Sequence, residues 1–468
     1  MMMDCEKIKK ELLDDIRIFS EKLRGQKEVL VVSHHDADGI TAAAILIDLF
    51  RFLDIDVESM ISKQLDSKVV REIKNQGKTV VFSDMGSGQL MIIRENKLDY
   101  YIIDHHQPLK KDDRQVNPHF YGYDGGSDVS GAGMAYLVAK SLGRTDMAHL
   151  ALVGAVGDMQ DSQGKLESIN RVILSDAVKQ GSVKVKNDLR LFGRQSRPLH
   201  LMLAYASDPI IPGLTGNQQG CMQFIESLDI NPRRDDNNFK SYVDLDINER
   251  KKLISALYMR LLDFNVPEYL IQGMVGEVYT LLAEEKRSEL RDTKEYATLM
   301  NACGRQEKPE IGLRVCLGDR GLGWQQAREL LQSHREMLRK GIEYLSNRGV
   351  EERKNLYYFK AGGDINERII GVVAGMAYGA RIIPPDKPIL AFAEDREDPE
   401  LMKVSARANW RLINKGIHLG NAMREVSKSL GGEGGGHDIA AGATIPKTEV
   451  DSFIELVDEL LDKQLAGI

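Results

Sequence analysis

The chain has 468 residues, which is more than one ordinary core accommodates, so we expect two or three domains. Hydrophobic residues make up 42% and charged residues 28%, the balance of a globular protein, and the net charge of −7 argues against a protein that coats nucleic acid with its whole surface. The four cysteines form no CxxC pair, which argues against a structural zinc site or a disulfide framework and indicates a reducing, cytoplasmic setting. No apolar run approaches the ~18 residues of a membrane span, and the N-terminus has no apolar signal core, so we expect neither membrane contact nor export.

Strand and helix patterns alternate through the first hundred residues. A polar amphipathic helix is predicted over 6–24, and short, mostly apolar strands are predicted over 28–33, 56–61, 79–83 and 99–103. Helical patterns fill the intervals between these strands. Such alternation is typical of a parallel, doubly wound α/β sheet. Two Gly- and Ala-rich helices follow, from Ser130 and from Thr145, and the second ends near Asp158.

The rest of the chain reads as an insertion followed by a second, smaller α/β unit. Residues 185–350 are mostly helical by pattern and basic at their start, and they end in a long connecting helix over 324–346. Beyond it we expect strands over 356–360, 388–393, 402–408 and 440–445, helices over 366–378 and 416–430, a Gly-rich loop over 431–436 and a final helix. The predicted domains are therefore 1–185, doubly wound; 186–320, the helical insertion; 321–350, the connecting helix; and 351–468, the C-terminal α/β domain.

Acidic and imidazole side chains follow three of the predicted strands. The residues concerned are His34, Asp36 and Asp38 after the first strand, Asp84 after the third, Asp104, His105 and His106 after the fourth, and Asp158 at a helix end. In open α/β sheets the carboxyl ends of the strands form the site. If the first strand end stays extended, the i, i+2, i+4 spacing also places its three side chains on one side.

Each of these residues, taken alone, has an ordinary structural explanation. A single Asp after a strand is most often a turn former or a helix cap, and an isolated His-His pair is most often a polar surface or core feature. Their coincidence at several strand ends is different, because crowding carboxylates on one cavity wall is costly without a cation. Carboxylate and imidazole ligands suit Mn²⁺ or Mg²⁺, and two such ions roughly 3.5–4 Å apart promote phosphoryl displacement. The sequence therefore predicts a two-metal site.

The motifs also resemble those of a known superfamily. His34-x-Asp36-x-Asp38, Ser83-Asp84, Asp104-His105-His106 and Gly157-Asp158 resemble the four motifs of the DHH phosphoesterases. The C-terminal Gly434-Gly-Gly-His437-x-x-Ala440-x-Gly442 resembles the signature of the domain associated with them. Segments 190–197 and 301–305 resemble the archaeal RecJ-like branch, which includes the GINS-associated nuclease.

This resemblance implies a role for each residue of the motifs. One ion is expected on Asp36 and Asp84 with His34 at or beside it, and a second on Asp38, Asp84, His105 and Asp158. Asp104 is expected to orient His105, and His106 to face the scissile phosphate. Bacterial RecJ typically has Asp where this chain has His34, and imidazole lowers the negative charge and bears on the preferred metal. The neighbouring His35 receives no role.

Substrate-binding residues are predicted in the C-terminal unit. Gly434, Gly435 and Gly436 can bring bare backbone N–H groups to phosphate oxygens, and His437 can donate beside them. Ser405 and Arg407 alternate with the period of one strand face, and Arg368 near a helix start is a further candidate. Glycine runs are common in plain turns and surface arginines are usually only solvated, so the resemblance carries this assignment. A groove between the two α/β units would then thread a single strand and exclude duplex.

These expectations lead to one principal hypothesis and two alternatives. We predict a metal-dependent exonuclease, with two Mn²⁺ or Mg²⁺ ions, that hydrolyses single-stranded DNA or RNA to mononucleotides in replication or repair. The resemblance implies GINS or a helicase as partner. An oligoribonuclease or cyclic-dinucleotide phosphodiesterase is the enzymatic alternative, and a non-catalytic replication adaptor is the alternative of another class. The long insertion argues against the first alternative and the intact acid set against the second, while the motifs leave cleavage polarity and the choice of DNA or RNA open.

Overall fold

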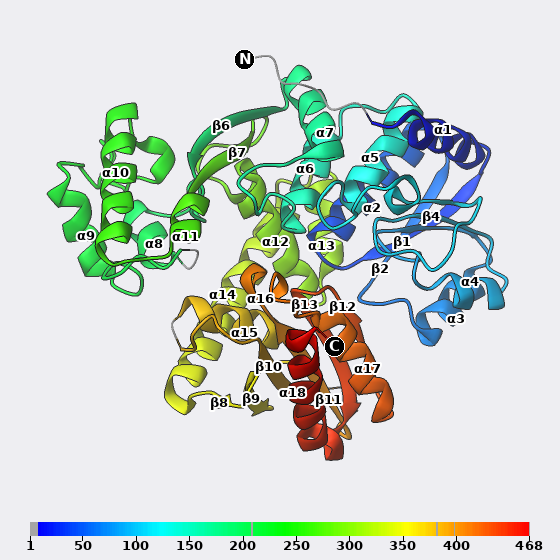
Figure 1. Cartoon of the computed structure of the whole chain (residues 1–468). Coiled ribbons are helices and arrows are strands. Elements are labelled where there is room, and N and C mark those ends of the chain that lie inside the picture. The colour runs from blue at the N-terminus through cyan, green and yellow to red at the C-terminus, as the bar shows by residue number, and fades with distance from the viewer. Residues whose placement is uncertain (1–7, 207–208, 381, 397, 468) are drawn as a thin grey trace. The chain divides into compact units, whose positions relative to one another are not determined.

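The strands between Glu28 and Val116 form a parallel sheet of order β2-β1-β3-β4-β5. Figure 1 draws this sheet, with β1, β2 and β4 labelled. The computed structural model describes residues 8–206, 209–380, 382–396 and 398–467. The strands of this sheet are β1 Glu28–His34, β2 Asp56–Ser62, β3 Thr79–Ser83, β4 Tyr100–Ile103 and β5 Gln115–Val116. All four neighbouring pairs are parallel, so the predicted parallel sheet is confirmed.

Helices cover both faces of the sheet, because successive side chains of a buried strand point to opposite sides. Val29 and Val31 of β1 share a core with the helices α1, α2, α5, α6 and α7, whereas Leu30 and Val32 share one with α3 and α4. The bounds of these helices are α1 Lys10–Arg24, α2 Ala37–Phe52, α3 Ser67–Gln76, α4 Leu90–Glu95, α5 Gly131–Ser141, α6 Ala148–Gly157 and α7 Ser168–Lys179, with a 3-10 turn at Pro118–Tyr121. The predicted doubly wound arrangement is thus present.

The insertion contains a two-stranded sheet that its sequence pattern did not suggest. β6 (Val183–Leu189) pairs antiparallel with β7 (Val275–Leu281), so the helical pattern expected for the basic start of the insertion is wrong there. Its lysines alternate with half-buried or buried apolar residues, which is the period of a strand. Between the two strands, short helices enclose a separate apolar core. They are α8 Leu199–Ala204, α9 Gln218–Ser227, a 3-10 turn Tyr242–Asp244, α10 Ile247–Asp263 and α11 Glu268–Gly273.

After β7 the chain returns to the core of the first sheet. A 3-10 turn at Glu289–Arg291 leads to α12 (Thr293–Arg305) and α13 (Pro309–Cys316), which bury Tyr296 and Met300 beside α2 and α6. The helix α14 (Leu322–Arg348) then spans the division between two compact units, Met1–Leu331 and Gln332–Ile468.

The second unit is built on a mixed six-stranded sheet of order β12-β13-β11-β10-β9-β8. Its elements are β8 Glu351–Glu352, β9 Tyr357–Gly362, α15 Ile370–Gly379, β10 Ile389–Glu394, β11 Leu401–Arg407, α16 Trp410–Ile413, α17 Leu419–Ser429, β12 Glu433–Gly436, β13 Ala440–Pro446, a 3-10 turn Lys447–Glu449 and α18 Val450–Ala466. The helix α15 shares an apolar core with one face of the sheet, and α17 and α18 share one with the other. None of the described helices combines the length and apolar character that a membrane span requires.

The Gly-rich segment differs from its prediction. Most of it, Glu433–Gly436, is an edge strand paired with β13 and not a loop. A Cβ at Gly434 would lie 2.5 Å from the Met423 carbonyl oxygen, and Gly436 has φ of +129°. Glycine is therefore required here by the close approach of α17 and by backbone conformation, which explains why a strand carries the composition of a loop.

Candidate metal centre

The segment after β1 turns at once into α2. His34 is the last residue of the strand, and Asp36 is the N-cap of the helix, its carboxylate accepting a hydrogen bond from the Gly39 N–H at 3.0 Å. Asp38 already lies in the first helical turn, so the expectation of one extended run of three side chains is wrong. A Cβ on Gly39 would lie 2.2 Å from the His34 carbonyl oxygen, which means that only glycine lets the helix start this close to the strand.

Asp84 follows β3 with a backbone conformation that most residues avoid. Its φ is +56°, and its N–H donates to the Ile103 carbonyl oxygen at the end of β4. The carboxylate is buried, and a Cβ on Gly131 of the neighbouring helix α5 would lie 2.7 Å from it. Asp84 is therefore held in one place by the sheet and by the close packing of α5.

The three residues after β4 make different contacts. Asp104 Oδ1 accepts from the His106 ring Nδ1 at 2.9 Å, and Asp104 Oδ2 accepts from the Ser87 N–H at 2.9 Å. The His105 ring instead contacts the Gly125 carbonyl oxygen through Nδ1 at 2.7 Å. Asp104 Oδ1 also accepts from the His105 N–H at 2.8 Å, so Asp104 contacts both histidines, while the Gly125 carbonyl oxygen holds the His105 ring.

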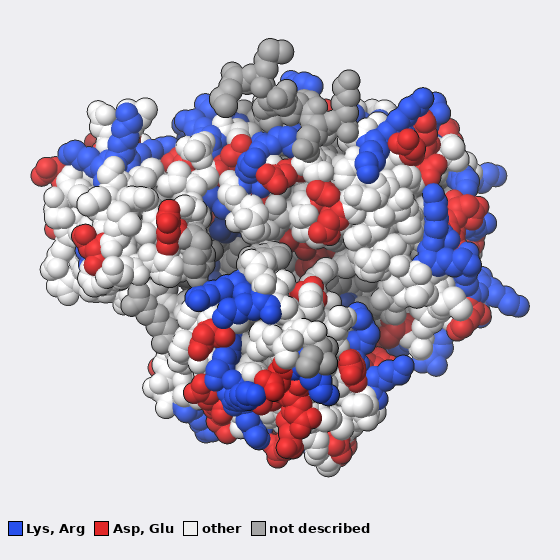
Figure 2. All heavy atoms as spheres, in the orientation of Figure 1, with Lys and Arg blue, Asp and Glu red and all other residues white. Residues whose placement is uncertain are grey.

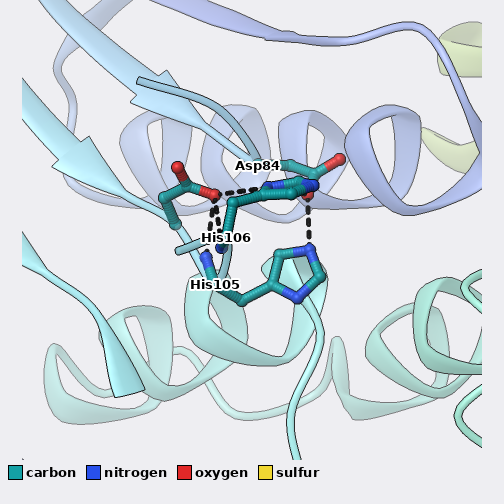
Figure 3. A group of neighbouring side chains, drawn as sticks. Asp84, His105 and His106 are labelled. Carbon is teal, nitrogen blue, oxygen red and sulfur yellow. Dashed lines mark hydrogen bonds and ion pairs between the residues drawn. The ribbon is translucent and has the colours of Figure 1, made fainter. Parts of the chain in front are cut away.

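The sequence-predicted metal ligands come together in adjoining groups. His34, Asp36 and Asp84 form one group and Asp38, His105 and Asp158 another, each with ligand atoms within 4.8 Å of one another. Asp84 Oδ1 lies 3.0 Å from His105 Nε2 and so connects the groups, as the close-up of Asp84, His105 and His106 shows (Figure 3). A further group with ligand atoms within the same 4.8 Å combines Asp84 and His105 with Asp104 and His106.

The electrostatics of these groups favour a bound cation. Burial raises the pKa of Asp84 well above its ordinary value, and the neighbouring carboxylates Asp38 and Asp36 raise it further. Burial also raises the pKa of Asp158, to about 7. Among the described residues, the buried atoms Asp84 Oδ1 and His34 Nδ1 make no hydrogen bond of acceptable geometry. Crowded carboxylate oxygens and imidazole nitrogens fit a pair of hard divalent ions.

The neighbouring carboxylates also change the pKa values of the histidines. Burial lowers the pKa of His105, but the carboxylates of Asp158 and Asp38 outweigh it and raise that pKa to about 9. Burial likewise opposes protonation of His106, and Asp104 outweighs it, so the pKa of His106 also rises to about 9. Burial alone would raise the pKa of Asp104, but the adjacent His106 ring lowers it below the ordinary range.

Backbone groups that no motif had indicated complete the site. The Gly131 and Ala132 N–H groups, in the first turn of α5, donate to the two oxygens of Asp38 at 2.6 and 3.0 Å. Asn301 of α12 accepts from the Ala37 N–H at 2.9 Å and so supports the first turn of α2. The sequence signal for the first of these was the small-residue run that follows Ser130, the N-cap of α5.

Family models match most of the chain. The N-terminal domain of the DHH family matches residues 28–155, the DHH-CID domain 191–275 and the DHHA1 domain 354–463. Protein MJ0831 of Methanocaldococcus jannaschii is 30% identical over 477 residues, which cover 99% of this chain and 99% of its own. The chain belongs to the DHH family. Its motif residues lie at the strand ends where the geometry above groups the acids and imidazoles.

Solved structures of other proteins share the fold of this DHH protein. RecJ from Thermus thermophilus, in complex with Mn²⁺, matches with a TM-score of 0.58 and 18% identity over 97% of this chain. The chain spans 55% of the length of that RecJ. CDC45 from Entamoeba histolytica matches with a TM-score of 0.63 and 13% identity, covering 97% of this chain and 98% of its own. At these identities the likeness concerns the fold.

The substrate residues predicted for the DHHA1 domain lie around β11. Ser405 and Arg407 are half-buried and share one face of this strand, with buried residues alternating on the other. A Cβ on Gly371 of α15 would lie 2.4 Å from Arg407 Nη2 and 3.0 Å from Ser405 Oγ, so both side chains contact this helix near its start. Arg368 is half-buried and its Nε lies 3.4 Å from Glu367, while the N–H of His437 donates to the Ala440 carbonyl oxygen.

Two arginines of the basic stretch that begins the insertion have a structural explanation. Arg194 is buried and joins Asp188 at 2.9 Å to Asp292 at 3.2 Å. Arg190 is also buried and donates to both the carboxylate and the carbonyl oxygen of Asp161. Figure 2 shows Lys and Arg interspersed with Asp and Glu over the face that it draws. Arg190 and Arg194 therefore form buried ion pairs within the first unit.

Positively charged side chains influence His35, which lies next to the ligand group of His34, Asp36 and Asp84. Burial and the positive charges of His34, Lys63 and Arg305 together lower the pKa of His35 to about 3. A Cβ on Gly304 would lie 1.7 Å from the His35 carbonyl oxygen, so the end of α12 packs directly on the β1–α2 turn. His35, to which the sequence assigned no role, is thus an uncharged side chain within the electrostatic range of Lys63 and Arg305.

Proposed function

We propose that this protein is a two-metal exonuclease that hydrolyses phosphodiester bonds of single-stranded DNA or RNA. The observation that carries the proposal is the pair of adjoining ligand groups, His34-Asp36-Asp84 and Asp38-His105-Asp158, joined by the 3.0 Å contact between Asp84 and His105. Asp38, Asp84 and His105 are buried and the other three candidate ligands are half-buried, and a pair of cations accounts for so many acids and imidazoles meeting at one site. Mn²⁺, present in the RecJ structure of the same fold, is the ion that we propose, with Mg²⁺ as the alternative.

We assign separate catalytic roles to the two ions and to the residues around them. When bound, two divalent ions would activate water and neutralise charge that develops on the phosphate. His106 is half-exposed, and its ring Nδ1 donates to Asp104, which fixes the orientation of the ring that we assign to the scissile phosphate. The adjacent Asp104 carboxylate raises the pKa of this ring, which favours the protonated form that donates to a phosphate oxygen.

The DHHA1 domain would hold the strand through its phosphates. Gly435, Gly442 and Ser405 stand directly opposite one another on three neighbouring strands, β12, β13 and β11, and two of the three carry no side chain. Bare backbone beside a hydroxyl and the Arg407 guanidinium suits phosphate oxygens. Gly434 and Gly436 have packing reasons of their own, so Gly435 is the glycine that we assign to substrate. Lys63 and Arg305 would contact a further phosphate next to the first metal group.

The test compares substrates of different length with one purified protein. End-labelled DNA and RNA oligomers and a dinucleotide are incubated with Mn²⁺, and the products are followed by length. The proposal predicts progressive release of mononucleotides from single strands and slower attack on blunt duplex. Cleavage of the dinucleotide alone would identify a small-substrate phosphodiesterase instead, and equal attack on duplex and single strand would contradict the threading of one strand.

The fold likeness to CDC45 keeps a non-catalytic replication adaptor as the second candidate function. Under that alternative the acid set has no catalytic use, and Asp84→Asn leaves partner binding intact. Binding of purified GINS or helicase components by both the wild type and Asp84→Asn, with no nuclease activity in either, would favour the adaptor. Activity in the wild type that Asp84→Asn removes would favour the exonuclease, whether or not a partner binds.

A further inference from the structure

Buried hydrogen bonds connect residues outside the motifs to the ligand group of Asp38, His105 and Asp158. Gln160 stands two residues after Asp158, and Met159 between them has φ of +59°, which turns the chain sharply after the end of α6. The Gln160 side chain is buried. Its Nε2 donates to Asp158 Oδ2 at 2.9 Å and to the Gly125 carbonyl oxygen at 2.8 Å.

The Gly125 carbonyl oxygen links this amide to the imidazole of the same group. It also accepts from His105 Nδ1 at 2.7 Å. A carbonyl oxygen only accepts, so the proton of a neutral His105 ring must be on Nδ1, and the Nε2 lone pair faces Asp84 and Asp38 at 3.0 and 3.6 Å. The Gln160 amide thus contacts the ligand Asp158 directly. It also shares the Gly125 carbonyl oxygen with the ligand His105 and so helps to orient that ring.

The orientation of the Gln160 amide is itself determined. Two acceptors require both hydrogens of Nε2, so Oε1 must face away from the site, toward Asn170. There the Asn170 Nδ2 donates to Gln160 Oε1 at 2.6 Å. Asn170 is buried in the first turn of α7, and its own N–H donates to the Asp128 carbonyl oxygen. The chain Asn170–Gln160–Asp158 is therefore anchored in the core and does not depend on solvent.

We infer that Gln160, held by Asn170, is a positioning residue for the cation position formed by Asp38, His105 and Asp158, and not for the position formed by His34, Asp36 and Asp84. This inference rests on the proposed two-metal function and deepens it. The side-chain hydrogen bonds of Gln160 go to Asp158, Gly125 and Asn170, and not to His34, Asp36 or Asp84. Different parts of the chain therefore determine the Mn²⁺ affinity of the two cation positions.

The experiment measures Mn²⁺ binding to the full chain by calorimetry and by electron paramagnetic resonance, starting from metal-free protein. The wild type is expected to show two binding events. Gln160→Met keeps the side-chain length and loses both donors, and we expect it to weaken one event by about 10- to 100-fold and leave the other unchanged. The unchanged event also reports that the variant is folded.

A second variant tests the orientation of the amide. In Asn170→Asp the new carboxylate only accepts, so it attracts Gln160 Nε2 and turns Oε1 toward the Asp158 carboxylate. The same event is expected to weaken, although residue 170 touches no proposed ligand. The matched control is Gln163→Met, an exposed glutamine three residues away on the same loop, which should change neither event.

The outcomes separate this inference from the proposed function. Two unchanged events in Gln160→Met, or equal weakening of both, would overturn the inference and leave the two-metal site standing. Failure of the wild type to bind two ions would overturn the proposed function, and the inference with it. Retained binding in Asn170→Asp with loss in Gln160→Met would remove Asn170 from the chain of contacts.

Discussion

Asp84 and His105 follow different strands, yet Asp84 Oδ1 lies 3.0 Å from His105 Nε2. The parallel register of β3 and β4, which pairs Ser83 with Ile103, brings these strand ends level. The contact joins the ligand group of His34 and Asp36 to that of Asp38 and Asp158. Asp84 is therefore the residue whose removal should affect both cation positions at once.

Asp84→Asn is expected to abolish activity and both Mn²⁺ binding events. The loss should exceed the roughly 100-fold that follows removal of an outer hydrogen-bonding partner of a metal ligand, because a shared ligand is removed. The metal-free variant should also unfold at a higher temperature than the metal-free wild type, since burial and neighbouring carboxylates raise the pKa of Asp84 and its ionised form destabilises the fold. Thermal unfolding with and without Mn²⁺ measures both effects.

A matched control for this variant is Asp54→Asn. Asp54 has φ of +55°, close to that of Asp84, but it is exposed and far from any ligand group. It should change neither metal binding nor thermal stability by more than about 0.5 kcal/mol. An Asp84→Asn protein that keeps the full Mn²⁺-induced stabilisation would contradict the shared-ligand role.

His106→Gln separates catalysis from metal binding. His106 is half-exposed, and we assign its ring to the scissile phosphate, so its loss should lower kcat by about 10²- to 10⁴-fold. Both Mn²⁺ events should remain, because the ligand groups of His34 and of Asp38 do not include it. Single-turnover kinetics and calorimetry on the same preparation provide the two readouts, and disappearance of a binding event would make His106 a ligand instead.

The sequence predicted the parts of this site that depend on strand ends and missed those that depend on packing. The order of strands and helices, and the acids and imidazoles that follow β1, β3 and β4, are local properties of the chain. The extended run from His34 to Asp38 was wrong because Asp36 caps α2, and β6 was missed because its lysines resemble a polar helix face. Gln160, Asn170 and the Gly125 carbonyl come together only through tertiary contacts, and nothing in their spacing indicates that.

Arg194→Met should act on stability and not on nucleic-acid binding. The guanidinium joins Asp188 and Asp292 in a buried network, and its removal leaves Asp292 without this ion pair, while Asp188 keeps its contact with Arg250 at 3.2 Å. We expect a loss of about 3–5 kcal/mol in the free energy of unfolding, measured by urea denaturation. Lys186→Met, at an exposed position of β6, is the control and should cost less than about 0.5 kcal/mol. A fully stable Arg194→Met protein with weakened oligomer binding would reverse this assignment.

Glu295 should make the fold less stable as pH rises. Burial, together with the charge of Asp292, raises the pKa of this carboxyl from 4.5 to about 7 in the folded protein. Folding therefore takes up a proton between these values, and the stabilisation that is present below pH of about 4.5 is lost as pH approaches 7, by about 3 kcal/mol in all. The difference in unfolding free energy between wild type and Glu295→Gln should shift by that amount across this range. Exposed Glu310→Gln should show no such shift.

Arg407→Met tests the substrate face of the DHHA1 domain. Arg407 shares one face of β11 with Ser405 and lies against Gly371 at the start of α15. If its guanidinium neutralises one phosphate, the variant should bind a single-stranded oligomer more weakly whatever the base sequence, and the slope of log K against log salt should fall by about 1. Both Mn²⁺ events should stay unchanged, since the ligand groups lie in the other unit. Arg411→Met, at an exposed position four residues on, is the matched control, and an equal salt slope in the two variants would remove Arg407 from the substrate site.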